Sequence, residues 1–281
     1  MKLRQSMPYR FLRYIYIYIL GLYDKVTGTQ ISVHIGDILA PQGNISENQL
    51  LIFFRILDAQ RFLSDGARDF PLQNRLSYAT YGSAHQEAAG NQSFEKLIRS
   101  YRENGYQGSC ITTDCHLCIM DGTHRMGMQV LFDIPIVRCR FLRRASKVGT
   151  LTFLQYQDRG FSKAELDRYC SEYRQMLLTL PCHSFLCIFP ASAESVVAEC
   201  LNRSCTVERI YSVKYQNNIH MAAEFQFTDP KYHGIKDGRP YSRAAAELEI
   251  QLHKATGDPT IFVTKSITEA SELLQTIKRK E

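Results

Sequence analysis

One stretch of the chain, CITTDCHLCIMDGTHRMGMQV from Cys110 to Val130, concentrates the residue types that do chemistry. Its cysteines and histidines are potential metal ligands, and its Asp-Gly-Thr-His-Arg run is a potential phosphate-binding turn. The two kinds of site need different residues at different spacings, so the sequence can be compared with each.

A zinc site needs four thiolate or imidazole ligands, brought together in pairs by tight turns. Cys115 and Cys118 supply one pair at a suitable spacing. The second Cys-x-x-Cys or His-x-x-x-His pair is absent, and small buried thiols are common in strands. We therefore expect no metal ligands among the site residues. The residues that would have to complete a zinc set are Cys110, His116, His124 and Cys139.

The alternative is a phosphate-binding turn at the start of a helix. Asp121 and Gly122 form a tight turn, and Thr123 is a suitable helix cap. The backbone amides of Thr123, His124 and Arg125 would then point outward at the positive end of the helix dipole, where an anion binds favourably. An ordinary strand-turn-helix junction with solvated His124 and Arg125 explains the same residues equally well, so local chemistry leaves both interpretations open.

Apolar periodicity predicts the elements that must position this turn. The turn is expected to lie between a β-hairpin and a helix whose Gly127 allows close packing on the sheet beneath it. A long loop, 67–91, precedes a helix that Ser93 is predicted to cap. The elements predicted in this part are strands at 31–35, 109–114, 117–121 and 134–142 and helices at 46–66 and 93–105.

The C-terminal part shows a second set of strands and helices. A helix with a capping box at Ser162 and Glu165 is predicted to end at Pro181. The polar, glycine-containing stretch from 229 to 240 is predicted to be a loop. The elements predicted after residue 181 are strands at 184–189, 206–215, 219–227 and 260–264 and helices at 193–201, at 243–256 and from 266 onward.

A chain of 281 residues is long enough for one large or two modest domains. Strands mixed with helices in this order predict an α/β (α+β) fold, in which a mixed-sheet domain with helical insertions is followed by a smaller α/β unit. The predicted boundaries are 1–150 for the first domain, 151–181 for a connecting helix and 182–281 for the second domain.

Composition places the chain among ordinary globular proteins. The net charge of +6 permits a nucleic-acid or phosphate-bearing partner without requiring one. Nine irregularly spaced cysteines are typical of reduced thiols in a cytoplasmic protein. The apolar run from 11 to 23 is interrupted by Arg13 and is shorter than the roughly 20 residues that span a membrane. We expect a buried or interfacial helix there, with membrane-surface contact through residues 8–23 as the less favoured alternative.

From about Phe94 to Leu142 the chain resembles the core of the ParB/sulfiredoxin superfamily, in which a helix and a β-hairpin are followed by a phosphate turn, a helix and a strand. The run from Met120 to Arg125 is similar to the Asp-Gly-x-His-Arg motif with which the strand before that turn typically ends. The resemblance implies that a nucleoside di- or triphosphate binds at the turn. The nucleotide-binding residues that it implies are Gly122, Thr123, His124 and Arg125.

Members of this superfamily include a partition protein that hydrolyses CTP, free-serine kinases and sulfiredoxin. Thr123 occupies the place of the sulfiredoxin cysteine, so sulfinic-acid reduction is not expected. Residues 160–170 resemble one helix of a helix-turn-helix, but no second helix follows before Pro181, so specific DNA binding is not expected. The chain is similar to stand-alone members that are encoded with polysaccharide biosynthesis genes.

The resemblance therefore implies a cytoplasmic, kinase-like phosphotransferase that acts on a small hydroxyl compound or a sugar, with magnesium accompanying the nucleotide. Asp37, at the end of the first strand, is the general base that the superfamily layout favours. Asp121 would fix the turn or orient a metal-bound water, and His124 would contact the transferred phosphate.

Two functions from other classes stay open. One is a nucleotide-sensing or nucleic-acid-binding module without turnover, and the other is a scaffold protein whose phosphate turn is vestigial. For the C-terminal unit, acceptor recognition and homodimer formation are the two roles left open.

Overall fold

The computed structural model describes residues 23, 28–40, 45, 47–72, 74–75, 84–105, 110–145, 156–180 and 183–278. The helix expected over 11–23, and with it the alternative of membrane-surface contact, lies outside these residues apart from Tyr23, which is exposed. In the described part of the chain, no helix combines the length and the apolar character that crossing a membrane requires.

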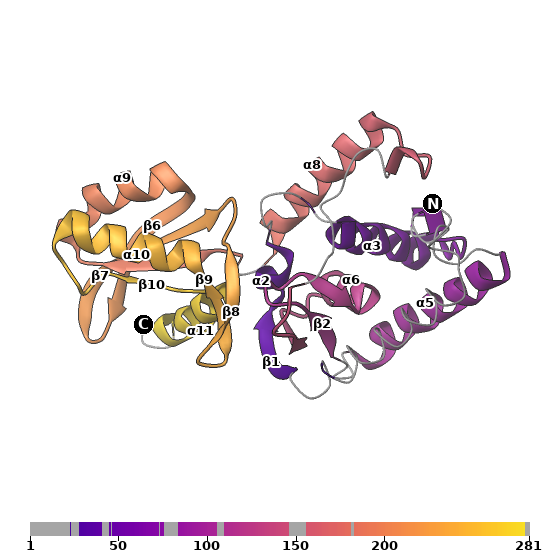
Figure 1. The fold of residues 1–281 in the computed structure, drawn as a ribbon, viewed down its shortest axis with the longest axis horizontal. Coiled ribbons are helices and arrows are strands. Elements are labelled where there is room, and N and C mark those ends of the chain that lie inside the picture. The colour runs from indigo at the N-terminus through magenta and orange to yellow at the C-terminus, as the bar shows by residue number, and fades with distance from the viewer. Residues whose placement is uncertain are drawn as a thin grey trace.

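The chain folds into two lobes, each built on its own four-stranded sheet, and the predicted mixed α/β class is confirmed (Figure 1). The sheet of the first lobe has the order β1-β4-β2-β3, with β2 parallel to β4 and the other pairs antiparallel. All four strands match strands predicted from the sequence. Their bounds are β1 Thr29–His34, β2 Ile111–Thr113, β3 Ile119–Asp121 and β4 Ile136–Phe141.

Five helices of the described chain pack on this sheet and on one another. Apolar side chains of α2, α3 and α6 cover the sheet, and a separate aromatic core joins α3 to α8. The helix expected to be a connector therefore packs into the first lobe, through pairs such as Phe53 with Tyr173. The helices are α2 Ile35–Leu39, α3 Glu47–Asp65, α5 Ala84–Asn104, α6 Thr123–Leu131 and α8 Lys163–Thr179.

Helix α5 begins earlier than predicted. It starts at Ala84, so Ser93 lies within the helix and not at its cap, and part of the predicted loop 67–91 is helical. The segment 84–92 is rich in Ala, Gln and Glu, which favour helix formation, but it lacks the apolar periodicity on which the prediction depended. The predicted end at Gly105 is confirmed, because this residue has a φ of +66° and its amide bonds to the Tyr101 carbonyl.

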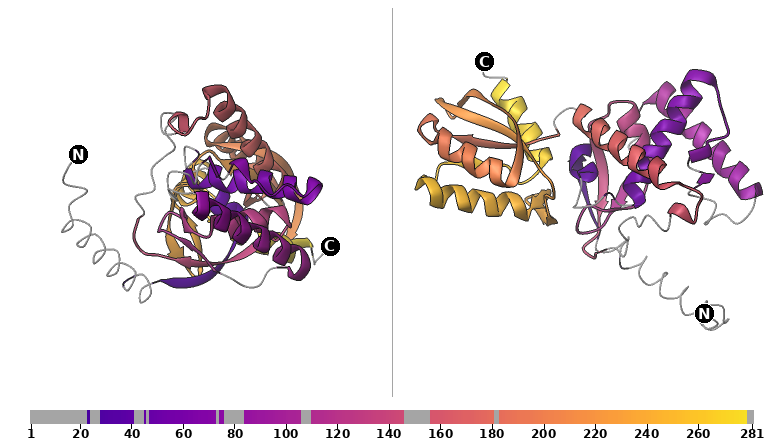
Figure 2. Two further views of the ribbon diagram at one scale, coloured as in Figure 1. Left: turned by 90° about the vertical axis from the view of Figure 1, so that its right-hand side faces the viewer. Right: turned by 90° about the horizontal axis from the view of Figure 1, so that it is seen from above.

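The second lobe is a sheet of order β10-β5-β7-β6 between helices on both faces (Figure 2). Alternate residues of β5 explain the two layers: Phe185, Cys187 and Phe189 pack toward α9 and α10, and Leu186 and Ile188 pack toward α11. The elements are β5 Phe185–Phe189, α9 Glu194–Ser204, β6 Cys205–Tyr215, β7 Asn218–Phe227, α10 Arg243–Thr256, β10 Phe262–Val263 and α11 Ile267–Lys278.

The stretch 229–240 was expected to be a loop, and it forms most of a β-hairpin instead. Strand β8 (Tyr232–Lys236) pairs with β9 (Arg239–Ser242), and the turn between them contains Asp237 and Gly238, both at positive φ. An Asp-Gly pair is a strong hairpin signal, which the general polarity of the segment obscured.

Candidate phosphate-binding site

The predicted phosphate turn opens on a cavity of about 870 Å³ beside the first turn of α6. Three helices and the β3–α6 turn line this cavity. Helix α3 contributes Arg55, and α5 contributes Phe94 and Leu97 with neighbouring polar groups. The turn contributes the whole predicted run from Asp121 to Arg125.

Gly122, and not Thr123, holds the N-cap position of α6. Its φ of +96° lies in the left-handed region that favours glycine, and a Cβ there would lie 2.8 Å from Ile111 Cγ2. No side chain caps the helix. The expected cap role of Thr123 is therefore corrected: Thr123 is the first helical residue, and the first-turn amides have no acceptor inside the helix.

Arg125 is anchored beside this turn by two contacts. One guanidinium nitrogen, Nη2, lies 3.3 Å from Asp121 Oδ2, and Nη1 donates to the carbonyl of Cys110. The Asp121 side chain is 75% exposed and that of Arg125 28%, so the carboxylate stands at the rim and the cation lies deeper. A guanidinium fixed in this way presents its remaining donors without further loss of side-chain freedom.

A second cation, Arg55, reaches the cavity from α3. The residue is 5% exposed, and its guanidinium keeps its charge at all physiological pH values. Burial of such a group is costly unless anions or hydrogen-bond acceptors compensate it. Gly127 lets the two helices approach here, because a Cβ at Gly127 would lie 3.4 Å from Ile52 O and from Arg55 Cβ. The expected role of Gly127 is thus corrected, since it brings α6 close to α3 and not to the sheet.

The positive potential of the cavity affects the pKa of His124. Burial, with Arg55 and Arg125 nearby, lowers the pKa of His124 to about 3, so the ring is neutral at physiological pH. Its ring centroid lies 5.1 Å from that of Phe94 on α5. His124 therefore adds no charge to the cavity, and the two arginines and the helix dipole supply the positive potential.

Asp37 does not belong to this site. It is fully buried and faces the second lobe, where its carboxylate accepts hydrogen bonds from the amides of Ile267 and Thr268 at 2.7 and 2.8 Å. The hydroxyls of Thr268 and Tyr232 donate to the same carboxylate. Burial raises the pKa of Asp37, while these donors oppose the rise. These four donors occupy the acceptor positions of the carboxylate, so a substrate hydroxyl has no place to bind to it. The geometry therefore gives Asp37 a structural role, and the expected role as general base is not supported.

The cysteine-histidine segment at the hairpin tip has a structural explanation. The Asp114 carboxylate accepts the amides of His116 and Cys118 at 2.9 Å each, which shapes the tip. His116 Nδ1 lies 2.9 Å from the carbonyl of Tyr232, so the tip docks on β8. Among the described residues, no group of three or more His, Cys, Asp or Glu side chains is arranged to hold a metal ion.

Magnesium bound together with a nucleotide is a different case, because Mg²⁺ commonly takes one or two protein carboxylates and completes its shell with phosphates and water. Asp121 lies on the rim of the cavity, exposed and next to the turn. This single carboxylate fits such an ion, which the nucleotide phosphates would mainly hold.

The structure thus brings together Asp121, Gly122, Thr123, His124 and Arg125 and leaves Asp37 elsewhere. Sequence reasoning missed Arg55. A signal was present, because this arginine interrupts the apolar run LLIFFRIL of a helix that is otherwise core.

Comparisons of the chain with protein families, with curated proteins and with solved structures found no match.

Proposed function

We propose that the chain binds the phosphate groups of a nucleoside di- or triphosphate in the cavity at the start of α6. The observation that carries the proposal is the convergence of Arg55, Arg125 and uncapped helix amides on one cavity whose described lining has a single acid, Asp121. A phosphate at this position accepts hydrogen bonds from the first-turn amides and lies beside the guanidinium groups that line the cavity. The similarity of the turn to the ParB/sulfiredoxin motif supports the same ligand.

The remaining walls suit the rest of a nucleotide. Half-buried Leu97 offers an apolar surface for a base, and exposed Ser93 offers a hydroxyl for a sugar. A volume of about 870 Å³ lies within the range of cofactor-sized sites. Nucleotide binding without turnover is the function that this geometry supports best, because the one acid in the described lining, Asp121, is ion-paired with Arg125 and is therefore a poor general base.

Phosphoryl transfer is the second candidate function, and the position of Asp121 favours it. This exposed carboxylate next to the phosphate-binding amides is suited to orient a magnesium-bound water or an acceptor hydroxyl. The acceptor would be a small hydroxyl compound or a sugar, and the family resemblance implies surface polysaccharide biosynthesis and a cytoplasmic protein.

The test is thermal-shift binding of ATP, ADP, CTP and GTP with magnesium to the native protein, to Arg125→Ala and to Arg102→Ala. Arg102 lies at the end of α5 and outside the cavity, so its variant controls for loss of one positive charge. We expect at least one nucleotide to raise the melting temperature by several degrees in the native protein and in Arg102→Ala, but not in Arg125→Ala. A shift that survives in Arg125→Ala, or no shift with any nucleotide, contradicts the proposal.

Turnover distinguishes the two candidate functions. The nucleotide that gives a shift is incubated with the protein and magnesium, with and without candidate hydroxyl acceptors, and released phosphate and diphosphate products are measured. Binding without product supports the sensing function. Product formation that Asp121→Asn abolishes, while binding persists, supports phosphoryl transfer.

A further inference from the structure

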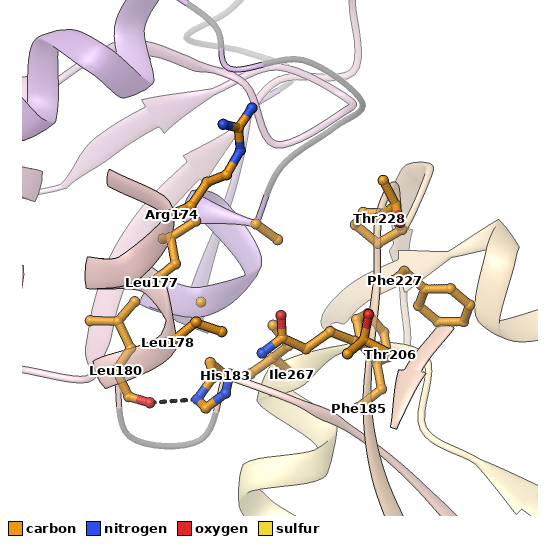
Figure 3. A pocket seen from close by; sticks show the side chains of 14 residues that line it. Arg174, Leu177, Leu178, Leu180, His183, Phe185, Thr206, Phe227, Thr228 and Ile267 are labelled. Carbon is orange, nitrogen blue, oxygen red and sulfur yellow. Dashed lines mark hydrogen bonds between the residues drawn. The ribbon is translucent and has the colours of Figure 1, made fainter. Parts of the chain in front are cut away.

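A second cavity, of about 350 Å³, lies in the seam between the two lobes (Figure 3). Helix α8 forms one wall, with Leu177, Leu178 and the C-cap residue Leu180, and the sheet of the second lobe forms the other, with Phe185, Thr206 and Phe227. This cavity shares no lining residue with the one at α6. A ligand here would contact both lobes at once.

The buried surface of this cavity is mainly apolar, and its polar groups are few and fixed in place. Glu208 is a partly exposed neighbour of the lining that accepts hydrogen bonds from His183 at 2.6 Å and from Ser184 and Gln226. Because the Gln226 amide nitrogen donates to Glu208, its amide oxygen is left as an acceptor. The Nδ1 of His183 lies 2.7 Å from the Leu180 carbonyl, so both ring nitrogens of this histidine already have partners.

One cation stands at the rim of the cavity. The guanidinium of Arg174 points away from His183 (Figure 3), and Arg174 is exposed to solvent. Within the described part of the chain, Arg174 makes no ion pair, and no acidic side chain lines the cavity. Arg174 therefore favours a negative group at its own end of the cavity, away from the Glu208 carboxylate bound to His183, while the apolar lining favours an apolar body.

We propose that this cavity binds a small apolar carboxylic acid. The carboxylate pairs with Arg174 at the rim, where water still solvates it, and a planar guanidinium matches the two carboxylate oxygens in a bidentate contact. The hydrocarbon body lies between Leu177, Leu180 and Phe185, which removes its apolar surface from water. A single rim cation and an apolar interior suit a monocarboxylate better than a phosphate ester, whose higher charge needs several donors.

The probe is octanoate, with octanamide as a neutral molecule of nearly the same shape, and calorimetric titration measures binding to the full chain. We expect octanoate to bind and Arg174→Gln to weaken it at least tenfold, while octanamide binds both proteins equally and more weakly than octanoate binds the native one. Arg168→Gln, which removes the same charge from the same helix outside the cavity, is expected to bind octanoate like the native protein. A Thr206→Phe variant, which fills the cavity from an exposed strand position, is expected to lose both ligands while its melting curve stays cooperative.

Absence of octanoate binding up to about 5 mM overturns the proposal, as does equal binding by Arg174→Gln and the native protein. Unchanged binding by folded Thr206→Phe also overturns it, because the ligand would then bind elsewhere. The result is independent of the nucleotide proposal, since Arg125→Ala leaves this cavity intact and is expected to bind octanoate normally.

Discussion

At the scale of single residues, two arginines and a histidine determine the electrostatics of the cavity at α6. Arg55 is buried and Arg125 is anchored, and the pKa of His124 is lowered by both. A neutral histidine between two cations is unusual for a solvated surface turn, where the ring would titrate with its ordinary pKa. The residues of the turn thus differ from those of a solvated strand-turn-helix junction, which was the simpler interpretation of the sequence.

The pKa of His124 is expected to respond to a bound anion. Without ligand, its Cε1–H NMR signal should not titrate between pH 8 and about pH 5, because the folded-state pKa is about 3. Sulfate keeps its double charge over this range and offsets the field of Arg55 and Arg125, so it should move the onset of titration to higher pH. The loss of one signal in His124→Gln assigns the resonance, and sodium chloride at equal ionic strength is the control.

The lowered pKa of His124 also predicts that the folded state becomes less stable as the pH falls. The unfolded chain, with a histidine pKa near 6.5, takes up the proton before the folded chain does. The stabilisation that neutral His124 contributes is therefore present above about pH 6.5 and is lost as the pH falls toward 3. A His124 signal that titrates near pH 6.5 without sulfate would contradict both expectations.

At the scale of elements, the β3–α6 turn depends on one backbone position. Gly122 combines a positive φ with close contact to the side chain of Ile111 on β2. The turn can therefore keep the helix start near the sheet only while this residue has no Cβ. This contact sets the direction of the first-turn amides of α6. It also positions Arg125, which lies in the same turn of the helix.

Gly122→Ala is expected to destabilise the chain by about 3 kcal/mol, because it adds a steric clash to the strain of a left-handed conformation. Gly105→Ala is the matched control, since its φ is +66° and nothing lies within 4 Å of an added Cβ. Gly105→Ala should lower the free energy of unfolding by about 1 kcal/mol, because it adds only the strain of the left-handed conformation. Urea unfolding of the two variants measures the difference, and equal destabilisation would show that the contact with Ile111 is not tight.

At the scale of the whole molecule, the seam joins the lobes through a buried polar network. The carboxylate of Asp37, in the middle of α2, accepts hydrogen bonds from the amides at the start of α11 in the second lobe. His34 next to it is also buried; burial, with a smaller contribution from His183, lowers its pKa to about 4. These contacts fix the second lobe against β1 and so shape the seam cavity.

Asp37→Asn tests this role. The asparagine keeps one acceptor oxygen, but its NH₂ group faces the N–H and O–H donors that the second carboxylate oxygen accepted. Because these donors lose their acceptor, the free energy of unfolding should fall by about 3 kcal/mol. Asp237→Asn, in the exposed β8–β9 turn, removes the same charge and should leave stability nearly unchanged. Denaturant unfolding gives both values.

Nucleotide binding by the folded fraction of Asp37→Asn should match that of the native protein. If a phosphotransferase activity is found, loss of turnover in Asp37→Asn without loss of stability would restore this residue as the general base.

The sequence by itself determined the mixed α/β class, the strands around the phosphate turn, the α8 capping box and the run from Asp121 to Arg125, because these depend on local periodicity and on turn and cap residues close in the chain. Only the tertiary structure showed that Arg55 lies at the cavity beside this turn and that Asp37 lies elsewhere, between the two lobes. Both depend on contacts between elements far apart in sequence: α3 with α6, and β1–α2 with α11. A buried carboxylate and a catalytic one look alike in a sequence, and only the groups packed around each of them distinguish the two.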